Sequence, residues 1–172
     1  MNITPKIIIT DTNIITDLNN ANILKEFISL SNVYISDMVM NDEINSKTGN
    51  VKLINTFKVI EASTNELLEV TKLSLTEKKL STYDLLNYVI AKNNNAILAT
   101  GDNRLKLFSE SKGIEVIRTL KIIELMVEHN IISKDKAINA CELLLKNQKT
   151  RIPKNDINNL LETLKKDLVT TN

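Results

Sequence analysis

The stretch Lys6-Ile7-Ile8-Ile9-Thr10-Asp11-Thr12-Asn13 decides the fold class. Its apolar, β-branched run is typical of a buried strand in a parallel sheet, and it ends abruptly at the carboxylate of Asp11. The same pattern recurs in Ala96-Ile97-Leu98-Ala99-Thr100, which runs through Gly101 into Asp102. Either aspartate alone could simply cap the helix that follows its strand. Two strands that both open into an aspartate predict a site built on carboxylates at one edge of the sheet.

Short β-rich runs alternate with helical patterns over residues 1–118. The expected strands are 6–10, 33–35, 57–62, 96–100 and 114–118. The expected helices are 14–30, 37–44, 63–72, 75–92 and 102–112, with capping residues at Ser36 or Asp37 and at Ser63, and a left-handed Gly113 after the last helix. This alternation predicts an α/β protein whose central parallel sheet of four or five strands carries helices on both faces.

From Thr119 onward the pattern contains helices only, expected at 120–128, 133–147 and 153–168. No linker rich in Gly, Pro or Ser precedes them, so residues 119–172 are predicted to be a helical extension packed on the core domain of residues 1–118. Acids and lysines are interleaved along this tail, as on solvated helix faces. We therefore expect the tail to serve packing or association rather than chemistry, and its surplus of apolar positions would allow a homodimer contact.

The composition limits the classes of function that the chain can have. At 172 residues it is long enough for one domain, and 22 Lys and Arg against 21 Asp and Glu give no overall attraction to nucleic acid, so any such contact must come from a local patch. The single Cys141 excludes an internal disulfide and a cysteine zinc ribbon, and its apolar neighbours indicate a core position. The only histidine, His129, lies near a predicted helix end. No run is long and apolar enough for a signal peptide or a membrane span, so we expect a cytoplasmic protein without membrane contact.

Four acids occupy positions that a parallel α/β fold could bring together. Asp11 and Asp102 follow strands, and Glu43 lies in the helix after the second strand. Asp84 falls inside the predicted helix 75–92, where aspartate has modest helix propensity and gains nothing from the helix dipole. Four clustered carboxylates without a cation would repel one another and raise each other's pKa values. Such a cluster therefore predicts a site for Mg²⁺ or Mn²⁺, hard cations that prefer oxygen ligands and can stabilise charge on a phosphoryl oxygen.

These acids lie in segments that resemble the successive motifs of PIN-domain nucleases. The segments are Ile7-Ile-Ile-Thr-Asp11-Thr-Asn13, Glu43 before Ile44, Leu80-Ser-Thr-Tyr-Asp84 and Leu98-Ala-Thr-Gly-Asp102-Asn-Arg-Leu105. The resemblance covers roughly residues 6 to 118. It implies a three-layer α/β/α fold and phosphodiester hydrolysis that depends on Mg²⁺ or Mn²⁺, usually with single-stranded or structured RNA as the substrate.

The resemblance also implies roles for individual residues. By position, the residues implied to bind metal and to carry catalysis are Asp11, Glu43, Asp84 and Asp102. The residues implied to surround them are Thr12, Asn13, Thr100 and Asn103, of which the first three would donate hydroxyl or amide hydrogen bonds. Asn103 stands where some members carry a further acid, so the chain departs from the pattern for a second metal. Arg104 and Lys106 follow Asp102 and are expected to contact a substrate phosphate.

The tail resembles one branch of the same family. Ile117-Arg118-Thr119-Leu120 and Thr150-Arg151-Ile152-Pro153 are similar to segments of bacterial and archaeal PIN proteins often found as toxin-like ribonucleases, although that branch usually has Gly at the position of Arg118. This similarity implies a toxin-like endoribonuclease that a protein inhibitor, an antitoxin, would control.

Two other functions remain open. A phosphatase of the haloacid-dehalogenase type also begins with an apolar strand ending in Asp, but it needs a second Asp where this chain has Asn13. A non-catalytic interaction module on a PIN scaffold is the second alternative, and the presence of all four acids argues against it.

Overall fold

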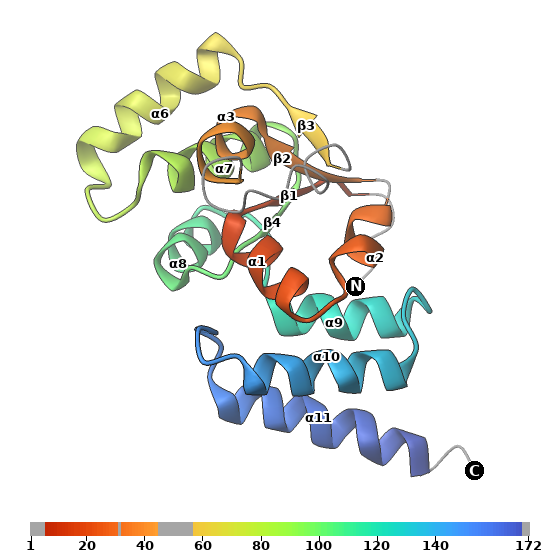
Figure 1. Cartoon of the computed structure of the whole chain (residues 1–172). Helices are drawn as coiled ribbons and strands as arrows, with labels where there is room; N and C mark the ends of the chain where they lie inside the picture. The colour runs from red at the N-terminus through yellow and green to blue at the C-terminus, as the bar shows by residue number, and fades with distance from the viewer. Residues whose placement is uncertain (1–5, 31, 45–56, 170–172) are drawn as a thin grey trace.

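A parallel sheet forms the central layer of the protein (Figure 1). The computed structural model describes residues 6–30, 32–44 and 57–169, with the side chains of all of these except 43, 44 and 167–169. Within this part of the chain the strands are β1 (Ile8–Thr10), β2 (Val33–Ser36), β3 (Lys58–Ile60), β4 (Ile97–Ala99) and β5 (Val116–Ile117). Their order across the five-stranded sheet is β3-β2-β1-β4-β5. The prediction of a parallel α/β fold is confirmed, although each strand except β2 is shorter than expected.

The two strands that lead into aspartates lie side by side at the centre of the sheet. β1 pairs with β4 in parallel register, so that Thr10 lies opposite Ala99. Asp11 follows β1 directly, and Asp102 comes three residues after the end of β4. Because parallel strands end at the same edge, both acids are delivered to one place, as the sequence predicted.

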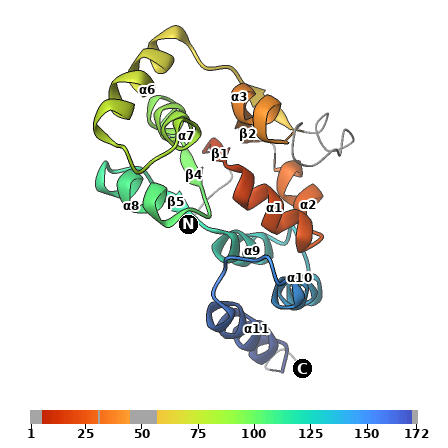
Figure 2. The same ribbon diagram turned by 60° about the vertical axis from the view of Figure 1, so that its left-hand side comes forward.

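Helices cover both faces of this sheet, which gives three layers (Figures 1 and 2). One face carries α1 (Thr12–Asn20), α2 (Leu24–Ser29) and α9 (Thr119–Glu128). The other carries α6 (Thr64–Thr76), α7 (Thr82–Asn93) and α8 (Asn103–Ser111). Successive strand residues point to opposite faces, so Ile8 packs in the first hydrophobic cluster and Ile9 in the second. Both faces are covered by helices, which explains why β1 and β4 are buried and apolar except for Thr10.

The predicted single helix over 14–30 is wrong, because the chain forms α1 and α2 there. Asn22, at a left-handed φ of 57°, turns the chain between them. Asparagine adopts this conformation more readily than most residues. Ile23 is then buried, and α2 begins at the next residue.

The predicted helix over 75–92 begins too early. α6 continues to Thr76, and α7 begins only at Thr82, after the N-cap Ser81. Other helix ends agree with the prediction. Ser36 caps α3 (Asp37–Val39), which continues as the π-helical turn η1 (Met40–Ile44). Ser63 forms a capping box at the start of α6, and Gly113, after α8, has a left-handed φ of 80°.

The tail forms α9, α10 (Lys134–Lys146) and α11 (Lys154–Val169), stacked beneath the first face of the sheet (Figure 1). Its buried side chains, among them Ile123, Leu144 and Ile157, belong to the same hydrophobic cluster as Ile8. Cys141 is fully buried there, and burial raises the pKa of its thiol to about 11, so it acts as an apolar core residue.

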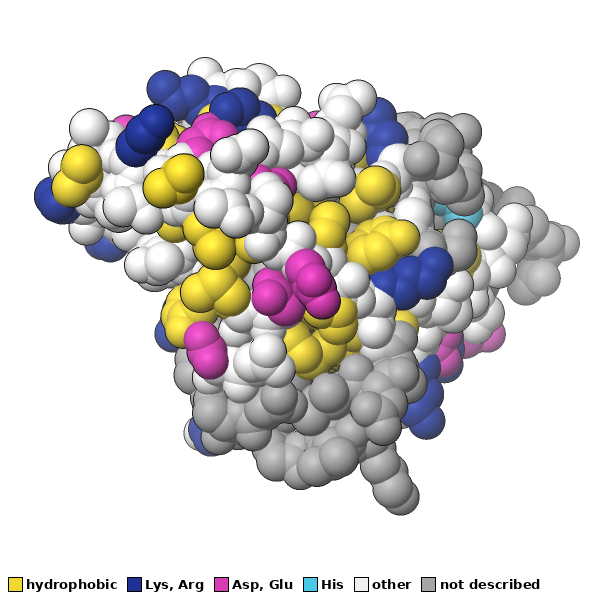
Figure 3. Space-filling view, turned by 90° about the horizontal axis from the view of Figure 1, so that it is seen from above, with side chains coloured by type: hydrophobic (Ala, Val, Ile, Leu, Met, Phe, Trp, Pro, Cys, Tyr) yellow, Lys and Arg dark blue, Asp and Glu magenta, His cyan; other side chains and the backbone are white. Residues whose placement is uncertain are grey.

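The apolar positions of the tail are used within the chain. The predicted association surface rested on eight apolar residues of the three tail helices. Seven of them are buried, namely Ile122, Ile123, Met126, Leu144, Leu160, Leu161 and Leu164, and the eighth, Leu143, is half-buried. A homodimer therefore stays a prediction that these side chains do not support. The large apolar side chains that are exposed lie instead on β3, α6 and α8, and Figure 3 shows the α6 face, where they stand among Lys and Arg side chains. In the described part of the chain, no helix combines the length and apolar character that crossing a membrane requires.

Candidate functional site

Three of the four predicted acids line one cavity of about 370 Å³ at the carboxyl edge of the central strands. We call it the acidic cavity. Its lining residues are Asp11, Thr12, Asn13, Thr16, Ser81, Tyr83, Asp84, Asn87, Asp102 and Arg151. They come from the ends of β1 and β4, from α1 and the start of α7, and from the segment before α11. The fold thus brings together residues that are more than 100 positions apart.

Asp11 is the most buried of these acids, with 5% of its surface exposed. It is the N-cap of α1, and its Oδ1 accepts a hydrogen bond of 2.9 Å from the Ile14 amide. Its Oδ2 accepts hydrogen bonds from the Thr100 hydroxyl and, at 3.3 Å, from the Gly101 amide. Burial raises the pKa of Asp11 to about 6, against the lowering effect of these hydrogen bonds. Burial makes the ionised form of Asp11 energetically unfavourable, and a carboxyl group with such a perturbed pKa is typical of a functional site.

Thr100 connects the two central strand ends. Its hydroxyl donates to Asp11 and accepts a hydrogen bond of 3.0 Å from the backbone amide of Asp102. Asn13 adds a longer contact, in which its Nδ2 lies 3.5 Å from Oδ2 of Asp11. Thr100 and Asn13 are therefore placed to orient Asp11, the role that the sequence suggested for them. Asn103 is exposed and begins α8, beside Asp102.

Asp102 uses one carboxylate oxygen for a structural purpose. As the N-cap of α8, its Oδ1 accepts hydrogen bonds from the amides of Arg104 at 2.7 Å and Leu105 at 2.9 Å. Its Oδ2 accepts no hydrogen bond from the described residues, so this oxygen is available to a ligand. The capping role and the site role of this aspartate are compatible, because they use different atoms.

The predicted position of Asp84 in a helix middle is wrong. Asp84 is the third residue of α7 and forms a capping box with Ser81. Its Oδ2 accepts hydrogen bonds from the Ser81 amide at 2.9 Å and from the Ser81 hydroxyl at 2.8 Å. An acid in the first turn interacts favourably with the helix dipole, so Asp84 has a structural reason to be there. Its Oδ1 accepts no hydrogen bond within the described chain and can bind a ligand in the acidic cavity.

Asn87 lines the same cavity and was not predicted as a site residue. It lies one turn after Asp84 on α7 and is 2% exposed. Its buried Oδ1 has no hydrogen-bond partner among the described residues. Such an oxygen costs about 1–3 kcal/mol when it is left unpaired. Its position three residues after Asp84 was visible in the sequence, but only the fold shows that it is buried beside the acids.

The donor set of the acidic cavity fits a hard divalent cation. The free oxygens of Asp84 and Asp102, the carboxylate of Asp11 and the amide of Asn87 supply oxygen ligands, and none of the described lining residues is Cys or His. No group of three or more Asp, Glu, His or Cys side chains in the described chain converges tightly enough to enclose an ion. Mg²⁺ is commonly held by one or two carboxylates and keeps several waters, so a looser arrangement suits it.

Glu43 is the predicted site residue that this geometry leaves untested. Its backbone belongs to η1, after β2, and its side chain lies outside the described residues. The neighbouring Asp42 accepts a hydrogen bond of 3.0 Å from the Tyr83 hydroxyl, and Tyr83 lines the acidic cavity. The turn that carries Glu43 is therefore linked to the wall of that cavity.

The contact of Arg104 and Lys106 with a substrate phosphate stays a prediction from the sequence. Arg104 is exposed, Lys106 forms an ion pair of 3.0 Å with Glu110, and neither is among the described lining residues of the acidic cavity. Arg151, from the tail, does line it. The tail therefore contributes a cation to the wall of the acidic cavity, and its predicted role in packing or association stays a prediction. The sequence offered one sign, since Arg151 falls in one of the tail segments that resemble PIN proteins.

Comparisons with known proteins agree with this fold. A family model described as a PIN domain matches residues 7–166. A crystal structure of PAE2754 from Pyrobaculum aerophilum is similar in fold, with a TM-score of 0.53 and 20% sequence identity over 71% of this chain and 98% of that one. No curated protein matches the chain. PIN domains are generally nucleases, and those nucleases typically use divalent metals. The chain belongs to the PIN-domain family.

Proposed function

We propose that the protein is an endoribonuclease that depends on Mg²⁺ or Mn²⁺ and hydrolyses phosphodiester bonds of RNA at the acidic cavity. The observation that carries the proposal is the burial of Asp11 beside Asp84 and Asp102 in one cavity at the ends of paired strands. Family membership supports hydrolase chemistry of this kind. A toxin-like role and control by a protein inhibitor stay predictions from the sequence.

The side chains of the cavity have distinct tasks in this proposal. Asp11, Asp84 and Asp102 would hold the cation, and Thr100 would keep the Asp11 carboxylate oriented. The bound cation would supply charge stabilisation at the phosphoryl oxygens and a more acidic water. Water adds across one P–O bond, which leaves a terminal phosphate on one fragment and a hydroxyl on the other. No covalent enzyme intermediate is needed, and the described lining residues offer no Cys or His nucleophile.

A non-catalytic PIN-scaffold module is the second candidate. The observation in its favour is that the described acids do not converge as a group of three. All three described aspartates also have capping roles, which would preserve them without catalysis. The haloacid-dehalogenase alternative loses its support, because the chain is a PIN domain.

Metal dependence separates the two candidates. Purified protein stripped with EDTA should leave a labelled single-stranded RNA intact, and excess Mg²⁺ or Mn²⁺ should restore endonucleolytic fragments. Fragment ends are read on a denaturing gel beside single-stranded DNA of the same sequence, which tests the choice of RNA. Cleavage that persists in EDTA would rule out the metal mechanism. Metal binding without any cleavage would favour the non-catalytic module.

A further inference from the structure

A second cavity, of about 430 Å³, adjoins the acidic cavity on the side of the tail. We call it the tail-side cavity. The two cavities share Asn13, Thr16, Asp102 and Arg151. A ligand in the tail-side cavity would therefore be next to the carboxylates, with Asp102 and Arg151 at the boundary between the two spaces.

The tail-side cavity differs from its neighbour in charge. Three cationic side chains, Arg118, Lys149 and Arg151, line it beside the acids Asp17 and Asp102. The near-neutral composition of the chain requires any nucleic-acid contact to come from a local patch, and this cavity supplies one. The tail builds it, since Lys149 and Arg151 belong to the segment between α10 and α11.

Both acids of this cavity are already engaged. Asp17 is half-buried and accepts a hydrogen bond of 2.9 Å from the Thr119 hydroxyl. One oxygen of Asp102 caps α8. Arg118 donates a hydrogen bond of 2.9 Å from its Nη2 to the Gly101 carbonyl, which anchors it at the end of β4. These contacts fix Arg118 and leave Arg151 and Lys149 as the adaptable cations of the tail-side cavity, of which only Arg151 also lines the acidic cavity.

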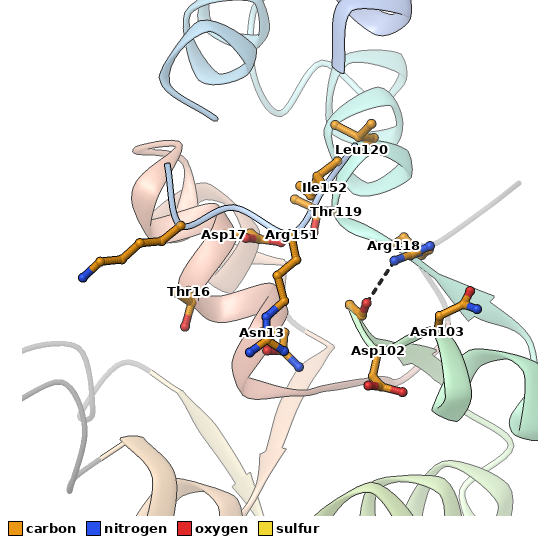
Figure 4. Close-up of a pocket in the computed structure, with 12 residues that line it drawn as sticks. Asn13, Thr16, Asp17, Asp102, Asn103, Arg118, Thr119, Leu120, Arg151 and Ile152 are labelled. Carbon is orange, nitrogen blue, oxygen red and sulfur yellow. Dashed lines mark hydrogen bonds between the residues drawn. The ribbon is translucent and has the colours of Figure 1, made fainter. Parts of the chain in front are cut away.

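Arg151 is poised for a ligand. Its side chain reaches from the tail segment towards Asn13, and Arg118 and Asp102 lie on the opposite side of the cavity (Figure 4). Its guanidinium forms no hydrogen bond or ion pair with any described residue, although burial raises the pKa of Asp17 across the cavity and the charge of Arg151 helps to oppose that rise. A planar guanidinium presents a fork of donors that matches the oxygens of a phosphate. The Arg151 guanidinium lies at the boundary between the two cavities. It can therefore bind one phosphate of a nucleic-acid strand while the next phosphate of that strand lies at the carboxylates of the acidic cavity.

We propose that the tail-side cavity is a subsite for a backbone phosphate of single-stranded RNA, bound by Arg151 with help from Arg118. This inference rests on the proposed function, because it places the neighbouring phosphate at the acidic cavity. Asn13 and Thr16 would add neutral hydrogen bonds to phosphate or sugar oxygens. The tail then contributes to substrate binding, and its docking on the core completes the site.

Arg151→Gln tests the subsite by binding rather than by cleavage. In the Asp11→Asn background, with Mg²⁺, the affinity for a fluorescein-labelled single-stranded RNA should fall about tenfold in fluorescence anisotropy. The plot of log affinity against log salt concentration should become shallower by about 0.7, the loss of one phosphate contact to a single strand. Arg151→Lys should restore the salt slope but only part of the affinity, because lysine lacks the fork.

Lys154→Gln is the matched control, because Lys154 is exposed in the same tail and lines neither cavity. It should leave affinity and salt slope unchanged. Equal affinity and slope for Arg151→Gln and Lys154→Gln would overturn the subsite, even if the wild-type protein cleaves RNA. Loss of binding in Arg151→Gln, with a wild-type protein that never cleaves, would keep the subsite and overturn the proposed nuclease activity.

Discussion

Asp11→Asn is expected to reduce cleavage of single-stranded RNA by roughly 100-fold or more while the protein stays folded. The variant removes one negative charge from the buried centre of the acidic cavity and keeps nearly the same shape. Asp11 receives its hydrogen bonds from both central strand ends, so no other described acid is positioned to replace it. Initial rates at saturating Mg²⁺ measure the effect, and circular dichroism reports whether the fold is kept.

Asp135→Asn is the control for that experiment. Asp135 is exposed in the first turn of α10 and lines neither cavity, so the same chemical change there should leave the rate unaffected. A folded Asp11→Asn protein that cleaves at the wild-type rate would show that the acidic cavity is not the site of hydrolysis.

The same variant is expected to make the metal-free protein more stable at neutral pH. Burial raises the pKa of Asp11 from 3.8 to about 6, so the folded state binds more protons than the unfolded state between these two values. Stability therefore falls as the pH rises through this window and stays lower above it. Removing the ionisable group should recover up to about 3 kcal/mol of unfolding free energy at neutral pH. The gain stays below that ceiling, because one atom of the amide cannot accept the hydrogen bond from Gly101.

Urea unfolding in EDTA across this pH range measures the difference between variant and wild type. The gain of Asp11→Asn should grow from near zero at the acidic end to its full value above pH 6, and the exposed Asp135→Asn should show no such trend. A variant that is less stable than wild type at every pH would contradict the claim that ionised Asp11 is a cost to the fold. A gain in stability together with a loss of cleavage would mark Asp11 as a residue kept for function.

Local patterns predicted the sheet and two of its acids well. The runs before Asp11 and Asp102 are apolar because helices cover both faces of the sheet. A strand buried on both faces is a continuous apolar run, which can be recognised in the sequence. The same segments carry the family resemblance. β1 pairs with β4 in the sheet. Because parallel strands place their carboxyl ends at one edge, this pairing brings Asp11 and Asp102 to the same place.

The spacing of apolar residues did not predict the position of Asp84 in its helix correctly. The helical spacing of apolar residues continues across the break between α6 and α7, so it predicted one helix from Leu75. The capping box Ser81-Thr-Tyr-Asp84 was present in the sequence, but the longer apolar pattern masked it. The resemblance pointed to an acid that lines the acidic cavity, even though the expected position of Asp84 in a helix middle was wrong.

Local sequence could not place Arg151 at the acidic cavity, although Arg151 falls in a tail segment that resembles PIN proteins. Its position depends on how α10 packs against α1 and α9 and how α11 packs against α10, which returns the connecting segment to the edge of the sheet. Arg104 and Lys106 are nearer to Asp102 along the chain, yet neither is among the described lining residues of the acidic cavity. Distance in sequence was a poor guide to the cations, because their location is set by tertiary packing.

The most direct test of the central claim is the anomalous scattering of Mn²⁺ in crystals of the wild-type protein. A manganese peak is expected inside the acidic cavity, within roughly 2 Å of a carboxylate oxygen of Asp11, Asp84 or Asp102. The peak should be lost in Asp11→Asn crystals grown in the same way. An acidic cavity without a peak at saturating Mn²⁺, in a protein that still cleaves RNA, would contradict the claim that these aspartates form the catalytic metal site.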